Sequence, residues 1–216
     1  MTALIRYQAA VLLRAHRWVG PLLLYATLLT FLGDRQPLRD GLDRSAAMLV
    51  PAAAWLTRSA LTAEPAAARA CTAVAGGPYR AHVAALLTGL GGGVILAFAG
   101  VAYELVRCQR PGGASALASA LGAGLVTAAV CLLVGSAVAT ACNPPLVRHP
   151  AIGFLSTIGA VVLALVADVS PANAALRGPG STLVASDWLT GLPLLVALAL
   201  VAVSWLASTL LAARRG

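Results

Sequence analysis

The sequence predicts an all-α, polytopic membrane protein built as a single transmembrane domain with six spanning helices. Hydrophobic residues make up 60% of the 216 residues and charged residues only 10%, with a mean hydropathy of +0.88. A soluble domain usually carries about 25% charged residues. About 20 apolar residues cross the ~30 Å hydrocarbon core as a helix. Six apolar stretches approach that length: 18–33, 46–62, 82–103, 115–142, 151–168 and 188–212.

Residues 1–17 are too polar to span, and we expect an amphipathic helix that lies in the membrane interface. On a helical wheel Arg6, Arg14 and Arg17 cluster, and apolar side chains lie on the opposite face. A basic amphipathic segment beside a spanning helix is typical of an interfacial anchor. A solvated leader is the alternative. Trp18 then begins the first span as an interfacial aromatic residue.

Arg58 is the one charge inside a predicted span. Residues 34–44 are expected to form a charged loop, and the second span follows over 46–62. At mid-bilayer an arginine costs roughly 2.5–3.5 kcal/mol on insertion scales. Its long side chain can extend to the headgroups from near the span's end. Alternatively, Arg58 faces the bundle and anchors the inner mouth of a pathway.

The third span is rich in glycine, and the segment before the sixth is rich in Gly, Pro, Ser and Asn. Gly89 and Gly93 form a G-x-x-x-G pattern, which lets two helix backbones approach closely. Packing within the chain and packing at a subunit boundary are both compatible with it. Residues 170–186 are expected to be a loop.

Arginine placement predicts that both termini are cytoplasmic. With the N-terminus inside, nine arginines lie on the inner side and six on the outer side, whereas six of the seven acids lie outside. This agrees with the positive-inside rule. Arginine wholly replaces lysine, as is typical of GC-rich bacterial genomes. The expected location is therefore a bacterial inner membrane.

The residues and motifs that the chain lacks exclude several classes of function. Without lysine it has neither a phosphate-binding P-loop nor a Schiff-base site. Hydrolase and metalloprotease motifs are missing, and no predicted span carries an acid near its middle. The four cysteines and three histidines are interpreted as packing and interfacial residues. We expect no catalytic residue, cofactor or metal, and no nucleic-acid partner, because the basic charges follow the ends of the apolar runs.

The segment between the second and third predicted spans is the most informative part of the sequence about function. Glu64 can cap a helix, Pro65 suits its first position, and Gly77 can end it before Pro78. A helix of about eleven residues, or ~16 Å, is too short to cross a membrane. We expect a cytoplasmic helix within residues 64–77, which either binds a soluble partner or serves as a plain connector.

Five residues of this segment resemble the inner loop of ABC-2-type permeases: Glu64, Arg69, Gly77, Pro78 and Arg80. The amphipathic N-terminus, the six spans and a second inner loop at 143–150 resemble the same family over the whole chain.

The resemblance implies a non-catalytic permease subunit of an ABC transporter, acting as an exporter in the lipid bilayer. It would pair with a second permease, identical or different, and with separate ATPase subunits. The helix within 64–77 would transmit their power stroke. The short outer loop favours a small hydrophobic compound or a peptide as substrate. A non-transporting membrane assembly factor or sensor is the alternative, and a membrane-embedded enzyme is a third class that lacks its motifs.

Overall fold

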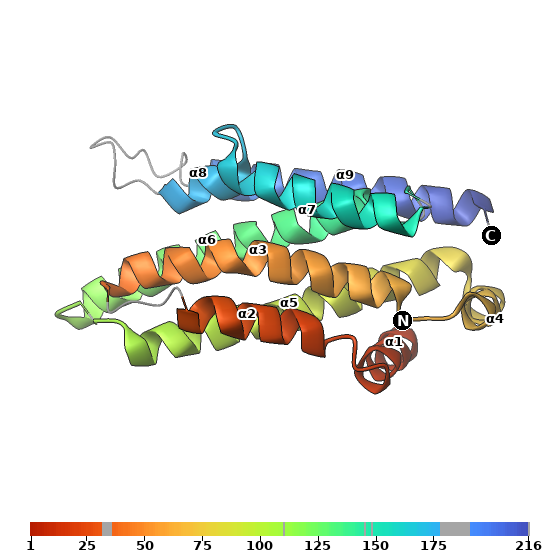
Figure 1. Ribbon diagram of the computed structural model, residues 1–216, viewed down its shortest axis with the longest axis horizontal. Helices are drawn as coiled ribbons and strands as arrows, with labels where there is room; N and C mark the ends of the chain where they lie inside the picture. The colour runs from red at the N-terminus through yellow and green to blue at the C-terminus, as the bar shows by residue number, and fades with distance from the viewer. Residues whose placement is uncertain (32–35, 110, 145, 148, 178–190, 216) are drawn as a thin grey trace.

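The computed structural model describes residues 1–216 except 32–35, 110, 145, 148, 178–190 and 216. The described residues are almost entirely helical and contain no strand, which confirms the all-α prediction. Long helices lie side by side as an elongated bundle, and two short helices lie across one end of it (Figure 1). The described elements are α1 (Thr2–Arg14), α2 (Val19–Phe31), α3 (Leu38–Thr62), α4 (Ala66–Gly76), α5 (Pro78–Arg107), α6 (Ala114–Ala141), α7 (Pro150–Val166), α8 (Pro171–Arg177) and α9 (Leu192–Arg215).

Four stretches of the described chain are long and apolar enough to cross a membrane. They are Pro78–Arg107, Ala114–Ala141, Ala151–Arg177 and Leu192–Leu211. They correspond to the third to sixth predicted spans. The stretch from 151 to 177 includes both α7 and α8. The start of the sixth predicted span, 188–190, lies outside the described residues. Four such apolar stretches are compatible with a multi-pass membrane protein, but the first two predicted spans are not among them.

The first predicted span contains α2, which has only 13 residues. At 1.5 Å per residue such a helix is ~20 Å long, less than the ~30 Å hydrocarbon core. Residues 32 and 33 of that predicted span lie outside the described residues. Helix α2 is therefore apolar but short.

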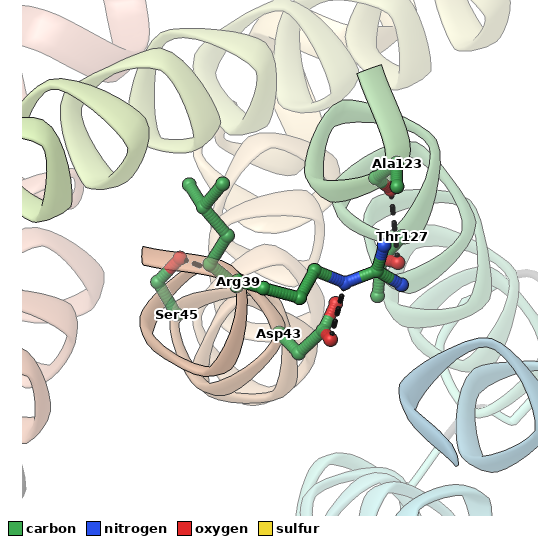
Figure 2. A network of polar contacts seen from close by, with 6 residues as sticks. Arg39, Asp43, Ser45, Ala123 and Thr127 are labelled. Atoms are coloured by element: carbon green, nitrogen blue, oxygen red, sulfur yellow. Dashed lines mark hydrogen bonds and ion pairs between the residues drawn. The ribbon is translucent and has the colours of Figure 1, made fainter. Parts of the chain in front are cut away.

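Helix α3 differs from the prediction more strongly, because it begins at Leu38 within the expected loop. Leu38 and Leu42 lie one turn apart and are almost fully buried, so this polar stretch has an apolar helical face. Arg39 Nε lies 2.8 Å from Asp43 Oδ2 one turn along, and the pair lies on the side of α3 that faces α6 (Figure 2). The charges that indicated a loop instead stabilise the first turns of a helix.

Helix α3 is the inner helix of the bundle and packs tightly against α5 and α6. A Cβ added to Gly89 of α5 would lie 2.9 Å from the Cα of Thr57. A Cβ added to Gly135 of α6 would lie 2.6 Å from the carbonyl oxygen of Val50. Gly89 of the third predicted span is thus used for packing within the chain, one of the two expected uses.

Part of the expected loop at 170–186 is helical. Helix α8 follows a tight turn after α7, and Asn173 Nδ2 donates to the carbonyl oxygens of Val166 and Ala167 at 3.3 and 3.1 Å. These bonds satisfy carbonyls at the end of α7, which have no helical partner. The rest of the expected loop lies outside the described residues.

The two ends of the bundle differ. Helices α1 and α4, the N-terminus and the end of α9 lie at one end, here named the α4 end (Figure 1). The opposite end carries α8 and the beginnings of α3 and α6. Because α3 and α5 run in opposite directions between these ends, the α4 end holds the short connection from Ala63 to Gly77.

Candidate functional site

Helix α4 lies outside the bundle, and its boundaries follow from Pro65 and Gly77. Pro65 precedes the first helical residue, and Gly77 ends the helix with φ of +84°. This left-handed conformation favours glycine. The backbone N–H of Gly77 donates to the carbonyl oxygen of Ala73 at 2.9 Å, as in a glycine-ended helix. None of the described side chains of α4 is buried.

Glu64 does not cap α4, contrary to the prediction. Its residue surface is only 5% exposed, and no side-chain bond caps the helix. Glu64 Oε2 accepts from Gln8 Nε2 at 2.9 Å, while Oε1 accepts from the hydroxyls of Tyr7 and Thr72, both at 3.1 Å. The carboxylate therefore joins α1, the end of α3 and α4 in one buried polar network.

The same network affects Tyr7. Burial, followed by the hydrogen bond to Glu64 and the negative charge of that carboxylate, raises the pKa of Tyr7 above its usual value of 10.0. The phenol consequently stays protonated and remains a donor to Glu64 well into the alkaline range. Helix α1 is held by a neutral hydroxyl and by the amide of Gln8.

Arg69 is exposed on α4, but its guanidinium is used within the chain. Nη2 donates to the carbonyl oxygens of Leu61 and Glu64, both at 3.1 Å. Leu61 belongs to the last turn of α3, where carbonyls lack helical partners and a positive charge is favourable. Arg69 thus fixes α4 to the end of α3.

The other predicted site residues lie where α4 joins α5. Gly77 makes the break, Pro78 is the first residue of α5, and Arg80 is exposed on its first turn. The structure thus brings the five residues to one end of the molecule. It leaves Arg80 on the surface and turns Glu64 inward.

The outward face of α4 holds a residue that the sequence reasoning did not single out. Val74 is 90% exposed, and Tyr79 at the start of α5 is also exposed. A large apolar side chain on a short surface helix is a candidate docking residue. Single exposed apolar residues are common, so only its place on a helix outside the bundle distinguishes Val74.

Arg58 faces the bundle, as its second interpretation expected, and its role at the mouth of a pathway stays a prediction. Its Nη1 donates to Asn143 Oδ1, and its guanidinium lies 5.5 Å from the centre of the Phe154 ring. Asn143 is fully buried, and its Nδ2 donates to the carbonyl oxygen of Ala139 at 2.6 Å and to Thr157 at 3.3 Å. Arg58 therefore links α3 to the end of α6 and to α7.

A cavity of about 400 Å³ opens beside Arg58. It lies between the turn joining α1 to α2 and the last turns of α3, and its lining includes His16, Arg17, Trp55 and Arg58. His16 has φ of +53°, an unfavourable value for a residue with a side chain. Such strained conformations concentrate at functional sites.

Comparison with known proteins gives no match. No protein-family model, no curated protein and no solved structure matches this chain. The resemblance to ABC-2-type permeases accordingly depends on the sequence features named above.

The opposite end of the bundle carries a second polar group. Glu104 on α5 is buried, and Cys108 Sγ donates to its Oε2 at 2.9 Å. Burial, together with this hydrogen bond, raises the pKa of Cys108 to about 11, so the thiol is protonated and poorly nucleophilic. Within the described ranges no three His, Cys, Asp or Glu side chains gather as metal ligands would. This polar pair packs against α3 at Gly41, where an added Cβ would lie 2.8 Å from Glu104 Oε2.

Proposed function

We propose that the chain is the permease subunit of an ABC transporter of the ABC-2 type, driven by separate ATPase subunits. The observation that carries the proposal is α4, an 11-residue helix outside the bundle, inserted between α3 and α5. A soluble motor protein can act on a bilayer-embedded partner only through a segment that protrudes from the membrane. Helix α4 has the length, exposure and attachments that such a coupling element needs.

The contacts of α4 with its neighbouring helices would transmit a movement of α4, driven by the ATPase, to the bundle. Arg69 ties α4 to the last turn of α3, and Glu64 ties it to α1 through Gln8 and Tyr7. Gly77 joins α4 directly to α5, the longest described helix. A displacement of α4 would then move α1, α3 and α5 together while Gly77 absorbs the change in direction.

Six crossings, with the α4 end in the cytoplasm of a bacterial inner membrane, form part of the proposal. Besides the four apolar stretches, residues 18–33 and 46–62 would cross. Helix α3 supports this because it runs through the bundle among the long helices and is covered by α5 and α6 (Figure 1). A helix enclosed by others can carry more polar residues than one that faces lipid. Helix α2 lies along α3, so it would complete the first crossing together with its flanking residues.

A complete transporter would contain two copies of this chain, or this chain with a different permease, and two ATPase subunits. The exposed apolar faces of α7 and α9 offer surfaces for lipid and for that second permease. A small hydrophobic compound or a peptide is the proposed cargo, exported from the cytoplasmic side. The alternative function, a membrane assembly factor or sensor, would use α4 as a connector only.

Val74 provides a sharper test of the coupling role than Arg69 does. Reversing the charge of Arg69 would also break its bonds to Leu61 and Glu64, so loss of function would be ambiguous. Val74 is 90% exposed, and Val74→Glu should leave the fold unchanged. If Val74 docks on the ATPase, the variant buries an unpaired carboxylate at that contact, which is unfavourable.

The experiment is co-purification of the tagged chain with a candidate ATPase subunit, followed by ATP hydrolysis in proteoliposomes. We expect Val74→Glu to weaken the association more than about tenfold, a loss of ~1.4 kcal/mol. Val169→Glu is the matched control, because Val169 is 95% exposed at the opposite end of the bundle. The isolated chain should hydrolyse no ATP. If Val74→Glu retains both the complex and its activity, the coupling role is wrong and the connector interpretation holds.

A further inference from the structure

The cavity beside Arg58 is bounded by cationic and hydrogen-bonding groups. Two arginines line it, one from the turn before α2 and one from α3, and His16, Ser59 and Thr62 lie with them. Among its described lining residues there is no Asp or Glu. An anion in this space would therefore meet positive charge without a competing carboxylate.

Arg17 is held in place at the edge of this cavity. Its Nη1 donates to the carbonyl oxygen of Thr62 at 2.8 Å and to the hydroxyl of the same residue at 3.2 Å. Both acceptors are neutral groups, so these bonds fix the guanidinium without placing a carboxylate beside it. The left-handed backbone of His16 makes the turn that brings Arg17 to this place. The positive charge is thus prepositioned, which lowers the entropic cost of binding an anion.

The other wall of the cavity is aromatic and leads to apolar surface. The ring of Trp55 packs on α2 at Gly20, where an added Cβ would lie 2.9 Å from the ring. Trp55 remains 41% exposed, and tryptophan favours the level of the lipid headgroups. Leu23 lies one turn after Gly20 on α2 and is also exposed. Trp55 and Leu23 therefore form an exposed apolar surface beside the cationic groups, here named the apolar track.

We propose that this cavity binds the phosphate of an anionic phospholipid. The phosphodiester would lie between Arg17 and Arg58, and the acyl chains would follow α2 past Trp55 and Leu23. A cationic pocket at the membrane surface attracts anionic headgroups, and each arginine near the surface contributes to the preference. A free phosphate ion shares the headgroup chemistry, but it would not use the apolar track. This site does not depend on the transport function proposed above.

Fluorescence quenching of Trp55 tests the proposal. Replacing Trp18, Trp188 and Trp205 by Phe leaves Trp55 as the only tryptophan of the chain. The protein is reconstituted in vesicles of phosphatidylcholine that contain a small fraction of phosphatidylglycerol with brominated chains, or of brominated phosphatidylcholine. We expect the anionic lipid to quench Trp55 with about fivefold higher apparent affinity.

Substitutions test whether the preference for the anionic lipid arises at the cavity. Arg17→Gln should abolish it and Arg17→Lys should restore most of it, whereas Arg6→Gln, an equal charge change on α1, should leave it unchanged. Equal quenching by the two lipids in the parent protein, or unchanged selectivity in Arg17→Gln, would overturn the proposal. Inorganic phosphate added to pure phosphatidylcholine vesicles distinguishes the sources. A phosphate-dependent change at Trp55 that prevents quenching by the anionic lipid would show a soluble anion site and refute the lipid site.

If the triple Phe variant does not fold, the intact parent protein serves instead. After purification in the presence of phosphatidylglycerol, native mass spectrometry should show one tightly retained lipid per chain. Arg17→Gln should lose it while its helix content, measured by circular dichroism, stays the same. Equal retention by the parent and Arg17→Gln would refute the assignment.

Discussion

Arg58 on α3 donates a hydrogen bond to the side-chain oxygen of Asn143, 85 residues later in the chain. Asn143 lies two residues after the end of α6, and its amide nitrogen also donates to Thr157 on α7. One fully buried amide therefore holds three helices at the α4 end.

Replacing that amide should destabilise the bundle. Asn143→Leu leaves the guanidinium of Arg58 and the carbonyl of Ala139 without this partner, and we expect a loss of about 1–3 kcal/mol. Thr157→Val removes the longest bond of Asn143 and the bond that the hydroxyl donates to the carbonyl oxygen of Gly153, but it leaves the contacts of Asn143 with Arg58 and Ala139, so it should cost less. Thermal unfolding in detergent, followed by circular dichroism, compares the two. An unfolding temperature for Asn143→Leu equal to that of the parent would contradict the role given to this amide.

Two glycines of α5 should respond in opposite directions to the same substitution. At Gly89 an alanine Cβ would press on the backbone of Thr57, so Gly89→Ala should destabilise the protein by about 1–3 kcal/mol. At Gly91 an added Cβ meets nothing within 4 Å, so Gly91→Ala should be neutral or stabilise the helix by up to about 1 kcal/mol. Unfolding temperatures of both variants provide the check. Equal effects would mean that α3 and α5 are not in close contact.

Glu64 should control the attachment of both short helices. Glu64→Ala removes the acceptor for Tyr7, Gln8 and Thr72 and leaves the buried amide of Gln8 unsatisfied, at a cost of about 1–3 kcal/mol. Hydrogen exchange should accelerate in α1 and α4 but not in α6. Glu64→Gln retains one acceptor oxygen and should show a smaller change. Uniform acceleration through the whole chain would indicate general destabilisation instead.

The attachment of α1 should also depend on alkaline pH. Because the pKa of Tyr7 is raised in the folded protein, its contribution to stability is complete below the usual value of 10.0 and is lost as the pH rises through the folded value. The phenolate would then repel Glu64. A spin label at Leu13→Cys in a Cys71→Ser background should gain mobility above pH 10. In Tyr7→Phe that pH-dependent step should disappear, and its persistence would assign the transition to another group.

Cys71 reports on the orientation in the membrane. It is exposed on α4, whereas Cys108 and Cys131 are buried and Cys142 is partly buried. An impermeant maleimide should label Cys71 in inside-out vesicles only. Ser115→Cys in a Cys71→Ser background, at the exposed start of α6, should be labelled only in right-side-out vesicles. Labelling of Cys71 from the outside would reverse the proposed topology.

The sequence predicted the long apolar helices because length and hydropathy are local properties. Helices α5 and α6 differ from their predicted spans by only a few residues at each end. The beginning of α3 was missed because Arg39, Asp40, Asp43 and Arg44 were interpreted as a loop. The spacing of Leu38, Leu42 and Leu49 on one helical face was the available signal.

The polar contacts of the candidate site could not be predicted in the same way. Pro65 made Glu64 a plausible cap, yet the partners that bury it include Tyr7 and Gln8, more than 50 residues earlier. Arg58 likewise meets Asn143 only after α5 and α6 have folded against α3. Local patterns indicate which side chains are polar, but long-range packing decides which of them meet.

The enclosure of α3 has a consequence for synthesis of the protein. Helix α3 leaves the ribosome before α5 and α6, the two helices that cover most of its surface. Until they arrive, Arg58 does not have Asn143 to contact, whereas Arg39 and Asp43 can already pair within α3. A nascent chain stopped before Pro78 should therefore be a poor substrate for stable integration, and a chain extended beyond Asn143 a good one. Assembly of this bundle is then co-operative between early and late segments of the nascent chain.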